Sequence, residues 1–376
     1  MRFDHITSKV GSVYEVKVSN YPIDSEWDNF VLKTPGGHYA QTALWAQAQA
    51  IRGWQTLRIV LKEQDNIIAG AQILTRTLPI VGSLGYLSWG PVCDVLDLYL
   101  SKLVVNEIQK VCKQSHIFYL VLKPPDNGEK IAHLLPGLGF HDATDLYGQT
   151  ASVVIDLTQD IDCILAQLSK FKRQTIRRIE RRGALIRREG TQQDIPGFYR
   201  LYALSSQRIG FTPYPEKFYQ ELWRVFEPRG YLKLFLSEYE GEPVSSLLTI
   251  PFKDSVTIYK LGWSGAYSNL YPNDTVYWEA IRWAKSNGYH YFDLGGVNAE
   301  AAQATLQNKP IPEWVLNSFH RFKLDYGGQI IFYPNTFDNI NIPFLNWGYR
   351  SLYPWIKNRT IIKPLFRKYR RRTEKQ

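Results

Sequence analysis

Two segments of the chain carry the same order of secondary-structure signals. Residues 57–91 read as two alternating strands around a polar turn at Asp65-Asn66, followed by a third strand and a Gly-Pro break. A helical stretch at 96–116 and a buried strand at 117–125 come next. Residues 231–296 repeat the order of strand, turn, strand, strand, helix and strand. The repetition predicts an α+β fold made of a duplicated unit, each half a twisted mixed sheet with helices on its faces.

The boundary between the two halves is predicted near Gln149, because the turn-rich residues 136–150 separate the repeated segments. A first domain is therefore expected at 1–149 and a second at 150–338. The remaining residues, 339–376, are predicted to form a basic and aromatic C-terminal tail.

The composition is that of a basic globular protein. With 376 residues, 44% of them hydrophobic, the chain can bury a large core, and its net charge of +10 suits contact with phosphates or an anionic membrane. Cys93, Cys112 and Cys163 are far apart and odd in number, which favours a reducing compartment over a zinc site or disulfides. No stretch approaches the ~20 apolar residues of a membrane span. The N-terminus has no apolar signal core, so a cytoplasmic protein is expected.

The most basic part of the sequence is residues 168–190, with nine Lys or Arg against two Glu. Apolar residues recur there and just before at three- and four-residue steps, which predicts one amphipathic helix that ends at Gly183. Its cations would lie on the open side and face an anion, although a merely solvated face is the alternative. The predicted apolar stripe consists of Ile161, Ile164, Leu165, Leu168, Phe171, Thr175, Ile176 and Ile179.

Seven short segments stand in an order typical of one enzyme family. They are YAQTALWAQAQAIRGW, GYLSWGPVCD, KFKRQTIRRIERRG, SSQRIGFTPYPEKFYQELW, YKLGWSGA, YWEAIRWAKSNGYHYFDLGGV and HRFKLDYGG. Together with the element order, which matches the acyltransferase fold known as GNAT, they resemble the FemABX peptidyltransferases over roughly residues 37–333. That family has two GNAT-like domains and adds amino acids to peptidoglycan precursors from aminoacyl-tRNA. The chain is similar to its compact members, because no helical-arm insertion interrupts residues 180–204.

The resemblance implies aminolysis of an ester without a covalent nucleophile or a cofactor. An unprotonated amine attacks the aminoacyl carbonyl, and the tetrahedral intermediate needs a donor for its oxyanion. By similarity to the family, Phe322 faces the transferred aminoacyl group and Lys323 stabilises the oxyanion, from a turn expected between two strands. The alternative is that Lys323 is a surface lysine at a strand edge.

The same resemblance implies several residues for binding the acceptor. Arg208, expected on a loop after a helix, would bind a diphosphate, and Tyr259 would line the same cleft. Asp293, at the end of a buried strand before two glycines, could orient an amine. Ordinary structural roles remain open: Arg208 could pair with Glu216, Tyr259 could be core, and Asp293 could cap a turn.

Two further acceptor residues and a donor surface follow from the resemblance. Tyr86 would contact the peptide substrate, and Asp94 would be a candidate catalytic base. The exposed cations of the basic helix would bind tRNA phosphates. These cations are Lys172, Arg173, Arg177, Arg178 and Arg181.

One departure from the family bears on the acceptor. Many members carry a lysine shortly after the first tryptophan of the segment WAQAQAIRGW, where it contacts nucleotide-linked phosphates. This chain has Gln47 and Gln49 there, with only Arg52 nearby. A lipid-linked acceptor is therefore favoured over a soluble UDP-linked one, and the expected partners of a monomer are aminoacyl-tRNA and a lipid-linked precursor.

Two other classes of function remain open. An acyl-CoA-dependent N-acyltransferase acting on a polysaccharide or lipid-linked sugar would need a basic, Gly-rich turn before a helix to hold pyrophosphate. Residues 265–275, GAYSNLYPNDT, contain no cation, which disfavours that class. A non-enzymatic RNA or membrane adaptor would need only the basic helix and the tail.

The tail predicts peripheral membrane binding, and the alternative is a tail that packs across the second domain and leaves a solvated basic end. Residues 342–376 carry ten Lys or Arg against one Glu, interleaved with Trp, Tyr and Ile. Aromatic rings favour the headgroup layer, and each cation near an anionic leaflet contributes about 1 kcal/mol. The full-length protein should co-sediment with anionic vesicles at low salt and be released at high salt. A chain truncated before Ile342 should stay in the supernatant, and equal sedimentation of both forms would exclude the tail as the anchor.

Overall fold

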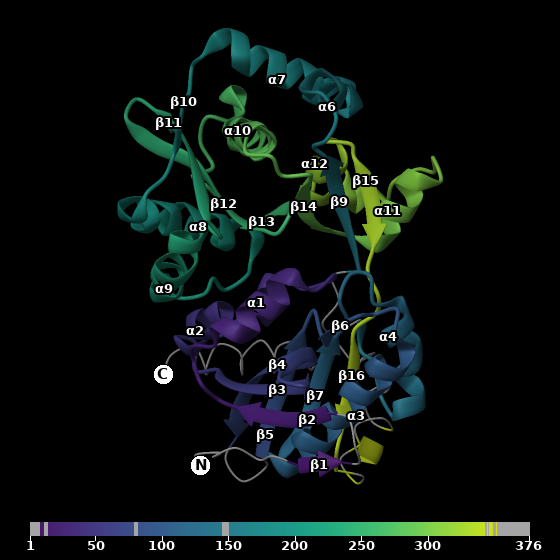
Figure 1. Ribbon diagram of the computed structural model, residues 1–376. Helices are drawn as coiled ribbons and strands as arrows, with labels where there is room; N and C mark the ends of the chain where they lie inside the picture. The colour runs from purple at the N-terminus through teal and green to yellow at the C-terminus, as the bar shows by residue number, and fades with distance from the viewer. Residues whose placement is uncertain are drawn as a thin grey trace.

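The protein forms two mixed β-sheets, one in each half of the chain, with helices packed on their faces (Figure 1). The computed structural model describes residues 8–10, 14–78, 82–144, 150–342, 344, 346–348 and 351. The first sheet has the order β1 (Ser8–Val10), β2 (Tyr14–Ser19), β3 (Gln55–Glu63), β4 (Asn66–Leu78), β5 (Gly82–Ser88), β7 (Ile117–Lys123), β16 (Phe337–Ile340) and β8 (His141–Asp142), with β6 (Val92–Cys93) beside β4.

The second sheet repeats the central part of the first. Its order is β10 (Ile186–Glu189), β11 (Lys233–Tyr239), β12 (Glu242–Phe252), β13 (Ser255–Trp263), β14 (Tyr291–Val297), β9 (Ala151–Asp156) and β15 (Gln329–Phe332). In each half three antiparallel strands lead into a helix and then into a strand that pairs parallel with the third. The predicted α+β duplication is confirmed.

Helices cover both faces of each sheet. In β3, Val60 joins the core formed with α1 and α2, whereas Ile59 and Leu61 join the core under α3, because alternate side chains of a strand point to opposite faces. In β11, Leu234 packs with α8 and α9 while its neighbour Phe235 packs with α10. The helices are α1 (Ser25–Lys33), α2 (Ala43–Ala50), α3 (Leu98–Gln114), α4 (Glu129–Leu134), α6 (Ile161–Gln167), α7 (Lys170–Arg182), α8 (Ile195–Ile209), α9 (Glu216–Phe226), α10 (Pro272–Ser286), α11 (Ala299–Leu306) and α12 (Phe319–Leu324).

The two sheets differ at their parallel strand pair. In the first half, β5 and β7 stay paired from Ser83 to Ser88. In the second half, β13 and β14 are both fully described, yet they pair only where Ser255–Thr257 meets Tyr291–Asp293. Beyond Thr257 and Asp293 the two strands separate, so only the second sheet opens a gap between its central strands.

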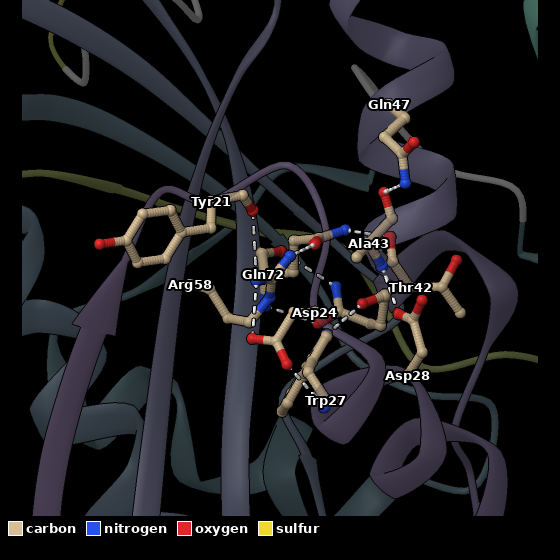
Figure 2. A network of polar contacts seen from close by, with 10 residues as sticks. Tyr21, Asp24, Trp27, Asp28, Thr42, Ala43, Gln47, Arg58 and Gln72 are labelled. Atoms are coloured by element: carbon tan, nitrogen blue, oxygen red, sulfur yellow. Dashed lines mark hydrogen bonds and ion pairs between the residues drawn. The ribbon is translucent and has the colours of Figure 1, made fainter. Parts of the chain in front are cut away.

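A buried polar network holds the first helices against the first sheet (Figure 2). Arg58 on β3 is fully buried and donates to Asp24 Oδ2 at 2.9 Å and to Gln72 Oε1 at 2.8 Å. The Gln72 amide in turn donates to the Thr42 carbonyl at 2.6 Å. The network therefore fixes the chain between α1 and α2, which forms one wall of the cavity described below.

The two halves share one apolar core. α2 of the first half packs against α9 of the second, and the Trp45 ring lies edge-on to Phe218, Phe226 and Tyr259 at centroid distances of 6.1, 6.2 and 5.9 Å. Aromatic pairs of this geometry add to the free energy of burial. The orientation of the halves is thus fixed by packed side chains.

The chain crosses between the sheets twice, and this corrects the predicted domain limits. β8 and β9 lie on either side of the predicted boundary at Gln149, but β16 returns to the first sheet and pairs with β7. The prediction that the second domain extends to 338 and a tail begins at 339 was therefore wrong, since residues 337–340 fill the edge beside β7. Most of the tail, 352–376 included, lies outside the described residues.

The two crossing segments are hydrogen-bonded to each other. Tyr333 N donates to Thr150 O at 2.9 Å, and Thr336 accepts from Ala143 N at 2.8 Å. The Thr336 backbone N–H also bonds the Thr144 hydroxyl at 3.1 Å. Residues on both sides of the first crossing are therefore hydrogen-bonded to the second crossing.

The predicted basic helix is two helices, α6 and α7, separated at Leu168 and Ser169. The Ser169 hydroxyl caps α7 by accepting from Lys172 N at 3.3 Å, and Gly183 ends the helix in the left-handed conformation, as predicted. Phe171 does not belong to the buried stripe, because it is 57% exposed. Lys172 was predicted on the exposed cationic face, and that was wrong: it is 2% exposed.

Lys172 forms a buried ion pair with Asp274 in the first turn of α10. Its ammonium also lies 3.4 Å from the centroid of the Phe322 ring, and Asp274 accepts a second hydrogen bond from Tyr326 Oη at 3.0 Å. Burial lowers the pKa of Lys172, and Asp274 opposes that shift. The pair therefore fixes α7 to α10 and α12 and cannot contact RNA.

Lys172→Met should destabilise the protein by about 3–5 kcal/mol, because it leaves the Asp274 carboxylate buried without its cation. Urea unfolding measures the loss. The double variant K172M/D274N should recover much of the stability, and K170M, which replaces an exposed lysine two residues earlier, should unfold like the wild type. A K172M protein as stable as K170M would contradict a structural role for the pair.

Candidate active site

A cavity of about 1280 Å³ lies between the two halves. The first half contributes the segment after α1, with His38 and Tyr39, and Trp89 after β5. The second half contributes the separated strands β13 and β14 together with side chains of α8 and α12. The gap in the second sheet is thus closed on one side by the first domain.

Lys323 and Asp293 lie together at the open end of β14. Lys323 Nζ donates to the Gly296 carbonyl at 3.0 Å. The Asp293 carboxylate accepts from the Ser152 hydroxyl, from Gly295 N at 2.7 Å and from Tyr333 Oη at 3.3 Å. An ammonium and a carboxylate therefore face the same part of the cavity.

Burial shifts the pKa of both groups. It lowers the pKa of Lys323 to about 8, a shift that Asp293 opposes and the nearby Lys260 reinforces. Burial raises the pKa of Asp293, against the hydrogen bonds from Ser152 and Gly295. Asp293 is therefore a stronger base than an exposed carboxylate, and Lys323 a better proton donor than an exposed lysine.

The structure corrects the local fold around Lys323. The sequence predicted a turn between two strands, but Lys323 lies on the short helix α12, whose Ser318 cap accepts from His320 N. Phe322 on the same helix lines the cavity, and its ring packs against Tyr277 at a centroid distance of 5.0 Å. Lys323 is therefore a cavity lysine and does not stand at a strand edge.

Arg208 and Tyr259 both line the cavity, and their roles in binding the acceptor stay predictions. Arg208 lies in the last turn of α8, where the sequence predicted a loop, and donates to Ser205 Oγ at 3.2 Å and to the Trp263 carbonyl. It is not paired with Glu216, whose carboxylate accepts from Gln220 at 2.9 Å. Burial raises the pKa of Tyr259 well above its usual value, so this tyrosine stays neutral.

Asp94 and Tyr86 do not belong to the lining of the cavity. Asp94 is exposed after β6, and its carboxylate accepts from Leu96 N at 2.9 Å. Since a base must reach the proton it removes, the prediction of Asp94 as catalytic base was wrong. Tyr86 is half-buried on β5.

The predicted tRNA cations on α7 divide into two groups. Arg173 donates hydrogen bonds to the carbonyls of Ala166 and Leu168, and Arg178 donates to Tyr271 Oη at 3.0 Å. Arg177 and Arg181 are exposed, and the described part of the chain provides neither with a hydrogen bond or an ion pair. Only these last two are free to bind phosphate without losing an internal contact.

Three residues of the site were missed at the sequence level. Ser152 and Tyr333 hold Asp293 from β9 and from the segment after β15, and neither stands in a recognisable motif. Lys260 lines the cavity beside Tyr259, although adjacent residues of a regular strand face opposite sides. The one signal in the sequence that could have indicated Lys260 is the presence of a cation within the apolar residues of β13.

Among the described residues, no group of three or more His, Cys, Asp or Glu side chains is placed to hold a metal ion. None of the described helices has the length and apolar character needed to cross a bilayer.

Comparisons with known proteins match both halves. The FemAB family matches residues 23–133, and the acetyltransferase (GNAT) domain family matches residues 168–303. The crystal structure of FemX superposes with a TM-score of 0.74 at 17% identity, over 87% of this chain and 97% of that one. In both halves the chain is similar to FemABX proteins.

Two curated relatives illustrate the range of the FemABX match. A lipid II:glycine glycyltransferase of Staphylococcus saprophyticus is 25% identical over 232 residues, which cover 59% of this chain and 56% of that protein. A UDP-N-acetylmuramoylpentapeptide-lysine N(6)-alanyltransferase of Weissella viridescens is 23% identical over 296 residues. These residues cover 74% of this chain and 86% of that protein. The chain thus spans about half the length of the glycyltransferase. L-PGS from Bacillus licheniformis shares the fold, with a TM-score of 0.53 at 13% identity.

Proposed function

We propose that this protein transfers an aminoacyl group from aminoacyl-tRNA to the stem-peptide amine of a peptidoglycan precursor. The observation that carries the proposal is the Lys323 ammonium beside the Asp293 carboxylate in a cavity formed by both domains. The FemABX relatives, whose names give glycyl and alanyl transfer to such precursors, support this substrate class.

The geometry suits aminolysis of an ester. The acceptor amine attacks the aminoacyl carbonyl, a C–N bond forms, and the bond to the tRNA ribose oxygen breaks. Lys323 stabilises the oxyanion of the tetrahedral intermediate, since a preorganised cation in a desolvated site is worth more than one in water. Asp293 takes the proton that the amine loses, and its raised pKa suits that role. The proton returns to the leaving ribose oxygen.

The N-terminus of α10 supports tRNA over acyl-CoA as donor. A pyrophosphate bound at a helix N-terminus needs free N–H groups and the positive pole of the helix. Here the first turn of α10 already holds the buried Asp274 carboxylate, which Lys172 neutralises. The exposed Arg177 and Arg181 on α7 offer cations to an RNA backbone instead. An acyl-CoA-dependent N-acyltransferase remains the alternative.

The acceptor is proposed to be lipid-linked, with the protein docked at the membrane by its basic tail. One relative is named for lipid II, and the cationic residues 342–376 suit an anionic leaflet. The vesicle experiment above tests the docking separately from the chemistry.

The donor is tested by mass measurement of the product. The full-length protein is incubated with a lipid-linked muropeptide and either charged tRNA or acetyl-CoA. Charged tRNA should add the mass of one or more amino acids, and acetyl-CoA should add nothing. An acetylated product formed without tRNA would replace the proposal by the alternative.

A charge-reversing double variant tests whether Arg177 and Arg181 contact tRNA. R177E/R181E should weaken tRNA binding and flatten its dependence on salt, because each lost phosphate contact lowers the slope of log K against log salt by about 0.9 for a duplex. R200E/R224E changes the net charge equally at exposed sites on α8 and α9 and should bind like the wild type. An equal loss of tRNA affinity in both double variants would mean that tRNA binding depends only on the net charge of the protein.

Lys323→Met should reduce turnover by ~10²–10³-fold, the usual effect of losing one oxyanion donor, with much smaller changes in donor and acceptor binding. K309M, which replaces an exposed lysine after α11, is the matched control. Single-turnover kinetics with charged tRNA provides the measurement. Near-normal turnover of K323M would remove Lys323 from the chemistry.

A further inference from the structure

A β-bulge turns two adjacent side chains of β13 toward the cavity. β13 pairs with β12 through Leu248 and Lys260 and then through Thr249 and Ile258, which leaves Tyr259 as the extra residue. Such a bulge re-aims side chains, and bulges are over-represented next to active sites. The Lys260 ammonium therefore lies against the ring of the adjacent Tyr259, although neighbours in a regular strand point to opposite faces.

Lys260 is surrounded by tyrosine rings. Its ammonium lies 4.6 Å from the centroid of Tyr259, 5.8 Å from Tyr214 and 6.0 Å from Tyr202. Over the described residues, no carboxylate, carbonyl or hydroxyl forms a hydrogen bond or an ion pair with it. The other two lysines of the cavity lining each have an oxygen partner: Lys253 bonds Thr34 O at 2.8 Å and Lys323 bonds Gly296 O at 3.0 Å.

A second cation lies next to Lys260. The Arg52 guanidinium stacks on the same Tyr214 ring at 3.4 Å and donates to Gln49 Oε1 at 2.8 Å. Burial, and then the charge of Arg52, lower the pKa of Lys260 to about 8. Two neighbouring cations with no anion between them carry an unbalanced charge that a bound anion would neutralise.

We propose that Lys260, supported by Arg52, binds an oxyanion of the acceptor substrate, either a phosphate or a carboxylate. The inference rests on the proposed function for the identity of the acceptor, but the site itself rests on the unpartnered ammonium and its second cation. Tyrosine rings on several sides exclude water and favour a charge-assisted hydrogen bond.

The two glutamines of α2 add no charge to the site. The Gln47 amide contacts Ala43 O of its own helix at 3.5 Å. Gln49 instead holds Arg52 beside Tyr214. The positive charge of this wall is thus supplied from the bulge of β13 and the end of α2.

The test measures binding by the full-length protein with two probes, inorganic pyrophosphate and a phosphate-free stem pentapeptide. K260M should weaken binding of one probe by about 10- to 100-fold, the usual effect of losing a charge-assisted hydrogen bond. K260R should retain most of the affinity. K233M replaces a lysine of the same sheet that pairs with Glu189 and should bind like the wild type.

The two probes distinguish the source of the anion. If K260M loses affinity only for pyrophosphate, Lys260 binds a phosphate of the acceptor. If K260M loses affinity only for the pentapeptide, Lys260 binds a carboxylate. Unchanged binding of both probes by K260M, or failure of the wild type to bind either, would overturn the site.

A measurement on the unmutated protein tests the site even if K260M fails to fold. Lysine acetylation followed by mass spectrometry should show Lys260 protected when the bound probe is present, with Lys233 unaffected. Equal labelling with and without probe also overturns the site. If the probes protect Lys260 but no aminoacyl transfer occurs with any acceptor, the proposed function fails and the anion site stands.

Discussion

The functional geometry depends on the point at which β13 and β14 stop pairing. Three paired residues hold the strands together, and beyond Asp293 the backbone groups of β14 turn away from β13. Gly295, with φ of 76°, and the shift in register between Asp293 and Gly296 allow β14 to bend there while it stays bonded to β9. The Gly296 carbonyl that holds Lys323 and the carboxylate of Asp293 both lie at this bend. In the first half, β5 and β7 remain paired and no equivalent opening forms.

The first domain has a supporting role that follows from this difference. Its closed sheet carries α1 and α2, and the polar network around Arg58 fixes the segment that bears His38 and Tyr39. Trp45 then joins that segment to Tyr259 and the aromatic side chains of α9. One copy of the duplicated unit thus provides the opening and the reactive groups, and the other provides the wall that closes it.

The sequence predicted what depends on periodicity and chain order. The duplicated strands and the Gly183 helix end follow from alternation and turn residues. Lys323, Asp293, Arg208 and Tyr259 were singled out from motifs and family order, and all four line the cavity, while their roles stay predictions. Residues whose partners lie far away in sequence could not be predicted. From the sequence alone Lys172 is one of several cations on a basic helix, because its partner Asp274 lies 102 residues later. β16 was predicted as the start of a tail, because its four residues carry no signal of the distant strand β7 with which they pair. Lys260 was missed because a bulge changes the parity of a strand without a sequence signature.

The double crossing between the halves has a topological consequence. Since the chain leaves the first sheet after β8 and returns to it as β16, the second domain is an insertion within the first, with both of its ends tied at one place. Two covalent connections therefore join the domains, in addition to the packed side chains around Trp45. Cutting the chain at one crossing would leave the domains covalently joined at the other, and their shared core would still hold their orientation.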